Sequence, residues 1–226
     1  GADLLKDDQA HTAGPTDEQL AADQASDPKL DVLLIGDSVL VRTLPYFQET
    51  FPYGAIDSAI NRRFSQGKSI YQNYVDQGVV GNVVVFALGI NAGATTDSQI
   101  DELVSTVGID KRIWFITIRC PDSWMEETAD RYENVSIIDW AGLSASHKEW
   151  FDGDGTHLTE TGAQVYINMI NDAIRDYLPE HSEGDVAVEV ESTTELTIDK
   201  MRTLMEHPFG NVFNPLKASI DPNPAE

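Results

Sequence analysis

The chain has 226 residues, 41% of them hydrophobic, and 38 acidic against 15 basic residues give it a formal charge of −23. This length and apolar content fit one substantial α/β domain with extensions. The negative charge repels nucleic acids and anionic membrane surfaces, so we exclude both as main partners. No apolar stretch is long enough to span a bilayer, and we expect no direct membrane insertion. Cys120 is the only cysteine, which excludes an intrachain disulfide.

Three regions follow one another along the chain. Residues 1–29 are rich in Asp, Gln, Ala and Thr, which predicts an acidic linker or lead-in. Because the chain begins with Gly1 rather than Met, we expect it to be part of a longer protein or a processed product. Residues 30–180 hold the regular alternation of a folded domain. Residues 181–226 form a C-terminal extension without a predicted role, in which 185–191 has the alternation of an edge strand and 198–206 the spacing of a short helix.

Within residues 30–180, apolar runs alternate with segments of helical spacing. The predicted strands are 31–36, 55–57, 82–88, 112–118 and 134–139. The predicted helices are 37–50, 66–77, 98–107 and 159–177. The run at 82–88 is continuous and β-branched, which is typical of a strand buried on both faces. This βαβ rhythm predicts a parallel sheet with helices on both faces.

The first predicted strand runs into Gly36-Asp37-Ser38, followed by an apolar segment that is compatible with a helix. In open α/β sheets, ligands bind outside the carboxyl ends of the strands. Backbone N–H groups at such a turn favour negative charge, so Ser38 is a candidate nucleophile whose intermediate they could stabilise. The alternative is that Asp37 or Ser38 only caps the following helix.

The third predicted strand ends in Leu88-Gly89-Ile90-Asn91. Asn91 therefore lies at the same edge of the sheet, where its side-chain amide can donate to a developing oxyanion. A turn asparagine between two glycines, here Gly89 and Gly93, is also common without a catalytic role.

A third motif, Asp152-Gly-Asp154-Gly-Thr-His157, precedes the last predicted helix. Asp154 and His157 are three residues apart, so one turn can bring both side chains into a cleft, with the carboxylate holding one ring nitrogen and the other accepting a proton. Asp152 is the rival orienting carboxylate, and the spacing favours Asp154. The motif lacks the further acidic ligands and the closing Glu of a calcium loop, and we predict no metal site.

In this order, the Gly-Asp-Ser turn, the Gly-Ile-Asn turn and the Asp-x-x-His loop resemble the SGNH, or GDSL-type, hydrolase family over about residues 30–178. The resemblance implies a three-layer α/β/α sandwich with a flavodoxin-like, five-stranded parallel sheet. It also implies Ser38 as nucleophile, His157 as base, Asp154 as orienting carboxylate and Asn91 as oxyanion donor. No metal or organic cofactor is implied.

Longer runs are similar to one branch of that family, the extracellular C-terminal domain of bacterial peptidoglycan O-acetyltransferases; these runs are 31–39, 83–91, 118–121, 135–140 and 154–163. In such proteins a membrane-embedded acyltransferase domain precedes the SGNH domain and supplies acetyl groups. The resemblance implies that this chain acts at the outer face of the membrane, on peptidoglycan glycan strands, tethered through a domain that precedes it.

The chain departs from the family pattern after the second predicted strand. Most members place there a glycine whose N–H completes the oxyanion hole, but residues 57–63 contain none, and Asn61 is the nearest equivalent. The oxyanion candidates are thus Ser38, Asn91 and Asn61. The family's Asn-Asp pair is here Asn91-Ala92, which removes a carboxylate from the edge of the site.

The resemblance predicts transfer of an acetyl group through Ser38 to the C6 hydroxyl of N-acetylmuramic acid. One alternative is a carbohydrate esterase of the same family, with water as the acceptor. A further alternative from another class is a non-catalytic cell-wall module that keeps only the fold.

Overall fold

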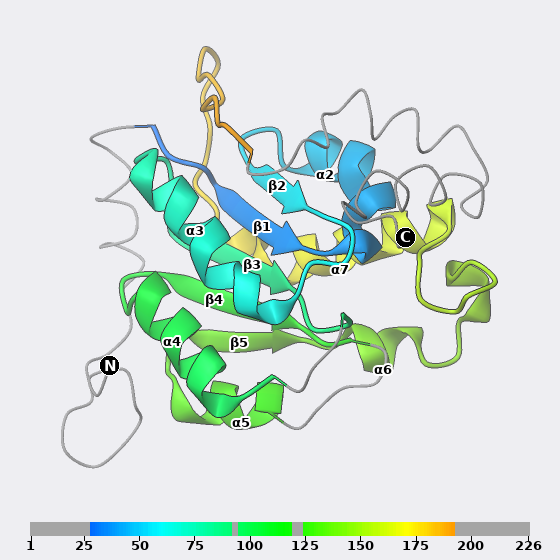
Figure 1. The fold of residues 1–226 in the computed structure, drawn as a ribbon. Coiled ribbons are helices and arrows are strands. Elements are labelled where there is room, and N and C mark those ends of the chain that lie inside the picture. The colour runs from blue at the N-terminus through cyan, green and yellow to red at the C-terminus, as the bar shows by residue number, and fades with distance from the viewer. Residues whose placement is uncertain (1–27, 92–94, 119–123, 193–226) are drawn as a thin grey trace, which may run out of the picture.

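A computed structural model of the chain describes residues 28–91, 95–118 and 124–192 (Figure 1). Within them lies a five-stranded sheet in the order β2-β1-β3-β4-β5, in which all paired strands are parallel. Its strands are β1 (Val32–Gly36), β2 (Ala55–Ser58), β3 (Val83–Ala87), β4 (Arg112–Ile116) and β5 (Val135–Ile138). All carboxyl ends therefore meet at one edge, as the βαβ rhythm predicts.

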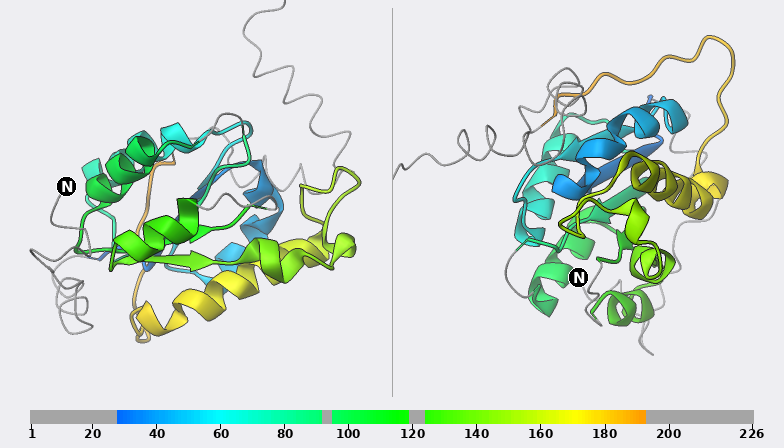
Figure 2. Two further views of the ribbon diagram at one scale, coloured as in Figure 1. Left: turned by 90° about the horizontal axis from the view of Figure 1, so that it is seen from below. Right: turned by 90° about the vertical axis from the view of Figure 1, so that its right-hand side faces the viewer.

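Helices cover both faces of this sheet, so the predicted three-layer sandwich is confirmed (Figure 2). One face carries α3 (Gly67–Asp76), α4 (Asp97–Val107) and α5 (Trp124–Arg131). The other carries α2 (Leu44–Thr50), α6 (Trp140–Ser144) and α7 (Glu160–Ile174). Short 3₁₀ helices at Ser38–Thr43, Phe64–Gln66, Lys148–Trp150 and Arg175–Tyr177 complete the connections.

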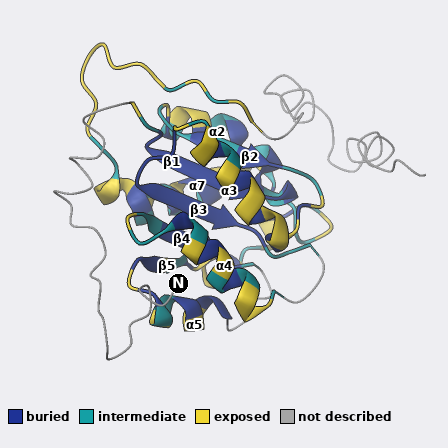
Figure 3. Cartoon of the chain, turned by 60° about the vertical axis from the view of Figure 1, so that its left-hand side comes forward, coloured by how far each residue is buried: buried dark blue, intermediate teal, exposed yellow. Residues whose placement is uncertain are grey.

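The alternation of side chains along each strand divides the core into two clusters. On β1, Leu33 and Ile35 face the α3–α4–α5 side, whereas Val32 and Leu34 face the α2–α7 side. All four are fully buried. Figure 3 shows the same division, with buried strands in the middle and helices that are buried on one side and exposed on the other. A sheet buried on both faces explains why its strands read as continuous apolar runs.

The turn after β1 depends on the small size of Gly36. A β-carbon added there would lie 2.3 Å from the Leu40 side chain and 2.9 Å from the carbonyl oxygen of Ala87 on the neighbouring strand. Only glycine lets the end of β1 approach both groups. The next two residues, Asp37 and Ser38, enter the functional site.

The nine predicted elements of the domain are confirmed, most ends lying within one or two residues of the prediction and the first helix being 3₁₀ up to Thr43. Two helices, α5 and α6, were not predicted. The edge strand at 185–191 is wrong, because these residues take no regular secondary structure. Cys120, the helix at 198–206 and nearly all of the 1–29 lead-in fall outside the described residues. In the described part of the chain, no helix has the length and apolarity to cross a membrane.

Candidate active site

The predicted nucleophile and base meet at the carboxyl edge of the sheet. Ser38 is the first residue of the 3₁₀ helix that follows β1, and the Asp37 carboxylate caps this helix by accepting a hydrogen bond from the Val39 N–H at 3.0 Å. The Ser38 Oγ lies 2.9 Å from Nε2 of His157, although 119 residues separate them. Capping belongs to Asp37, which leaves the Ser38 hydroxyl directed at an imidazole.

Asp154 holds the other side of the imidazole. Its Oδ2 lies 2.5 Å from Nδ1 of His157, while its Oδ1 accepts the backbone N–H groups of Thr156 and His157 at 2.9 and 3.0 Å. Partial burial disfavours the ionised form of Asp154 and so raises its pKa. The hydrogen bonds to His157 and Thr156 have the larger combined effect and hold the pKa of Asp154 below its usual value. An ionised carboxylate at this distance fixes the ring orientation and favours a proton on Nδ1, which leaves Nε2 as the acceptor toward Ser38.

The geometry distinguishes between the two candidate carboxylates. Asp152 directs its carboxylate to Arg42, with Nη2 and Oδ2 3.3 Å apart. Burial raises the pKa of Asp152, an effect that Arg42 partly offsets. Its backbone N–H instead donates to the carbonyl of His157 at 2.8 Å, which closes the loop. Asp152 therefore shapes the loop, and Asp154 is the carboxylate that contacts the imidazole.

The three predicted oxyanion donors follow the carboxyl ends of three neighbouring strands, β1, β2 and β3. The N–H of Ser38 is at the first position of a helix, where no carbonyl within the helix can accept it. Asn91 follows β3, and its Nδ2 donates to the main-chain carbonyl of Arg62 at 3.1 Å. Asn61 has a φ of 59° and is the one non-glycine residue with positive φ in the described ranges. This left-handed conformation is the one glycine adopts most readily, and asparagine is among the few other residues that tolerate it.

A buried ion pair between Asp57 and Arg62, which the sequence analysis did not predict, lies at the end of β2 and in the segment that follows it. Arg62 donates from Nη2 to Oδ1 of Asp57 at 2.7 Å, and the two side chains are 3% and 0% exposed. The second carboxylate oxygen of Asp57 accepts the Tyr74 hydroxyl at 2.7 Å. Asp57 was recognisable as a charged residue inside a short predicted strand, but its partner five residues later carried no local signal.

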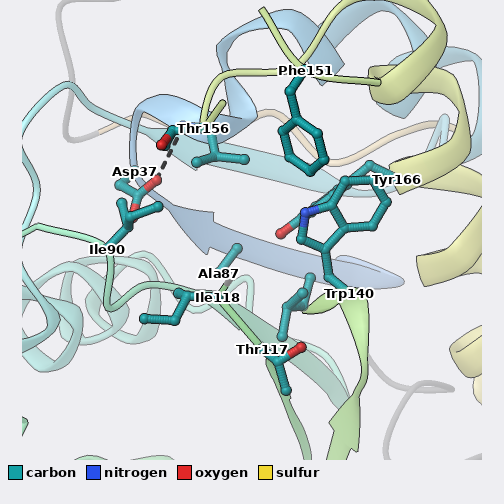
Figure 4. Close-up of a pocket in the computed structure, with 11 residues that line it drawn as sticks. Asp37, Ala87, Ile90, Thr117, Ile118, Trp140, Phe151, Thr156 and Tyr166 are labelled. Carbon is teal, nitrogen blue, oxygen red and sulfur yellow. Dashed lines mark hydrogen bonds between the residues drawn. The ribbon is translucent and has the colours of Figure 1, made fainter. Parts of the chain in front are cut away.

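A small hollow, partly open to solvent, lies beside the serine. The residues on either side of Ser38, Asp37 and Val39, belong to its lining. Figure 4 shows the rings of Trp140, Phe151 and Tyr166 along one side of the hollow. Its lining is mainly apolar. Burial at its edge raises the pKa of Asp37 to about 7.

Comparison with known proteins gives curated relatives of one kind. The O-acetyltransferase OatA of Staphylococcus aureus is 34% identical over 150 residues, which are 63% of this chain and 24% of the relative. The peptidoglycan O-acetyltransferase OatA of Listeria monocytogenes is 31% identical over 143 residues, which are 60% of this chain and 22% of the relative. The chain thus spans about a quarter of the length of these relatives. No protein-family model matches it.

Two solved structures have a fold similar to that of this chain. The C-terminal catalytic domain of peptidoglycan O-acetyltransferase A from Streptococcus pneumoniae, solved with a methylsulfonyl adduct, superposes with a TM-score of 0.59 at 22% identity, over 67% of this chain and 96% of that one. A two-domain esterase active on acetylated mannans has a TM-score of 0.50 at 12% identity, over 81% of this chain and 58% of that one. The chain therefore has the SGNH-type α/β fold, which it shares with the catalytic domain of the Streptococcus pneumoniae protein, and its sequence is similar to part of the curated O-acetyltransferases.

Proposed function

We propose that this chain is the serine-dependent acetyltransferase domain of a peptidoglycan O-acetyltransferase. The observation that carries the proposal is the continuous hydrogen-bonded chain from Ser38 Oγ through the imidazole of His157 to the Asp154 carboxylate, with distances of 2.9 and 2.5 Å. A nucleophile, a base and an orienting carboxylate in this arrangement are suited to acyl transfer. The similarity to O-acetyltransferases supports acetyl as the acyl group.

In the first half-reaction, Nε2 of His157 accepts the proton of the Ser38 hydroxyl while Oγ attacks the carbonyl carbon of an acetyl ester. The tetrahedral intermediate then collapses, and the bond to the donor oxygen breaks. His157 returns the proton to that oxygen, so the donor leaves as an alcohol and Ser38 carries the acetyl group. Asp154 stabilises the imidazolium that exists between these two proton transfers.

In the second half-reaction, the acceptor hydroxyl occupies the place of the departed donor. His157 takes its proton, its oxygen attacks the acetyl-serine, and the proton returns to Ser38 Oγ. We propose that this acceptor is the C6 hydroxyl of N-acetylmuramic acid. The sequence similarity to peptidoglycan O-acetyltransferases supports this choice.

Both tetrahedral intermediates place negative charge on the former carbonyl oxygen. We propose that the Ser38 N–H and the second N–H of the Asn91 amide donate to this oxygen, with the segment at Asn61 as the third donor. Removing one such donor typically costs about 2.7–4 kcal/mol in the barrier. The apolar hollow between Trp140 and Val39 suits the methyl group of the acetyl ester.

Because the matched region is about a quarter of the relatives' length, we propose that the acetyl donor comes from the remainder of a longer protein. In this proposal a membrane-embedded acyltransferase domain precedes the chain, and the acidic residues 1–29 link the two. The catalytic domain would then act at the outer face of the membrane, within reach of the glycan strands.

An acetyl esterase is the second candidate, and one observation favours it. The hollow beside Ser38 is partly open to solvent, so water can reach an acetylated serine and compete as the acceptor. The hydrolase and the transferase would share every residue named above. Only the acceptor distinguishes them.

The test supplies the purified chain with an activated acetyl ester, with and without muropeptide oligosaccharides, and follows the products by mass spectrometry. Acetylated sugar formed at the expense of free acetate supports the transferase. Fast release of acetate that no glycan alters would refute transfer and leave the esterase. A folded chain whose Ser38 is not labelled by a fluorophosphonate at neutral pH would refute both and indicate a non-catalytic module.

A further inference from the structure

Arg62 is a buried cation at the point where β1 and β2 end. Its Nη1 donates to two main-chain carbonyls, those of Gly36 at 3.0 Å and Asp57 at 2.7 Å, and its Nη2 donates to the Asp57 carboxylate. The planar, forked guanidinium can bind these three acceptors together, which the single ammonium of a lysine cannot do with the same geometry. Arg62 thus joins the carboxyl ends of two neighbouring strands.

Stability alone does not account for this ion pair. The desolvation of two buried charges commonly offsets their attraction, and apolar residues of similar size often give an equally stable protein. The Asp57 carboxylate is nevertheless surrounded by donors, because the hydroxyls of Tyr74 and Ser192 lie 2.7 and 3.4 Å from its Oδ2. Such a fully bonded group holds its partners in one geometry rather than several.

The main chain of the same residue reaches the candidate site. The carbonyl oxygen of Arg62 accepts the Asn91 amide at 3.1 Å, which determines that the nitrogen and not the oxygen of this amide faces the loop. An NH₂ group has two donors, and the described residues provide an acceptor for one of them. The direction of the second N–H therefore depends on where the Arg62 carbonyl is held.

We propose that Arg62 is a positioning residue for acetyl transfer: its side chain anchors the loop after β2 to the end of β1, and its carbonyl orients the Asn91 amide toward the oxyanion. The proposal rests on the proposed function, because it assumes an acyl transfer in which Asn91 is a donor. It gives a reason for the burial of the Arg62 guanidinium, because the main chain of the same residue binds Asn91.

The first variants are Arg62→Lys, which keeps the charge but loses the fork, and Arg63→Lys as the matched control on the exposed neighbour. The assay follows p-nitrophenyl acetate turnover, with thermal unfolding as the check on folding. For R62K we expect kcat to fall about 10- to 100-fold with KM within about twofold, because misplacing a donor affects the transition state and not substrate binding. R63K keeps both parameters.

The double substitution Asp57→Leu/Arg62→Met covers the case in which R62K does not fold. Replacing both charges with apolar groups leaves no unpaired charge in the interior, so we expect it to unfold within a few degrees of the wild type. It lacks the fork, and we expect it to show the same loss of kcat. A folded double variant with wild-type kcat would overturn the proposal.

A double-mutant cycle tests whether Arg62 acts through the amide. We expect Asn91→Ala alone to lower kcat about 100-fold or more, and addition of R62K to lower it by less than about threefold further. If the two losses multiply, Arg62 does not act through Asn91 and the proposal is wrong. A wild-type chain that neither turns over the ester nor is acylated at Ser38 would instead refute the proposed function, so the two failures are distinguishable.

Discussion

Replacing Asp154 with asparagine tests the role of the carboxylate with the smallest change in shape. The amide keeps the size of the side chain but cannot stabilise the imidazolium or hold the tautomer that leaves Nε2 as the base. For a buried triad carboxylate this change lowers kcat by about 10⁴-fold. Asp154 bonds Nδ1 of His157 at 2.5 Å but is 47% exposed, so water replaces part of what is lost.

We therefore expect Asp154→Asn to lower kcat by about 10²- to 10³-fold, equivalent to about 3–4 kcal/mol in the barrier at 1.36 kcal/mol for each factor of ten. The assay is ester turnover under saturating substrate. The matched control is Asp152→Asn, two residues away, which loses its ion pair with Arg42 but no contact with the imidazole. We expect this control to lose less than about tenfold. If D152N is more damaging than D154N, or D154N stays within tenfold of the wild type, the assignment of Asp154 is refuted.

Ser38→Ala should abolish acylation and lower turnover by about 10⁴-fold or more at an unchanged melting temperature, checked by intact-protein mass spectrometry and calorimetry; residual acylation would contradict its role. Gly36→Ala should cost about 1–3 kcal/mol of unfolding free energy, because the new methyl group would lie 2.3 Å from Leu40; unchanged urea denaturation would contradict this. Burial raises the pKa of Asp37 from 3.8 to about 7, so the folded state keeps a proton that the unfolded chain releases, and stability should fall as pH rises between these values. Asp37→Asn should flatten this pH dependence of the melting temperature, and an unchanged slope would show that Asp37 does not cause it.

The sheet was predictable because its strands are buried on both faces. The run Val83–Ala87 has no polar residue, so its pattern follows from burial alone. The helix α5 was missed because it buries only Trp124, Met125 and Thr128 among polar neighbours, which leaves a weak apolar period. The predicted edge strand failed for a related reason. Val188 and Val190 pack on the core from an irregular segment, and Val186 is 80% exposed, so the alternation reflects side-chain contacts without strand pairing.

The residue types of the candidate site were predictable, but several of their relationships were not. Gly-Asp-Ser and Asp-x-x-His are local patterns, and the hydrogen bonds of Asp154 to its own loop are local as well. The spacing of Asp-x-x-His already favoured Asp154 over Asp152, and the structure adds that Arg42, more than a hundred residues earlier in the chain, binds the rival carboxylate. The left-handed backbone of Asn61 could not be predicted from its neighbours; the sequence showed only that no glycine occupies this segment.

The sequence by itself determined the five strands of the sheet, their order along the chain, and which polar residues stand at their carboxyl ends, because burial and turn chemistry act over a few residues. The tertiary structure decided what these residues contact. It brings Ser38 within 2.9 Å of His157, and it places Arg62 between Gly36 and Asn91. Contacts of this kind join residues that are far apart in the sequence. They depend on how distant segments pack against one another, which no local sequence pattern indicates.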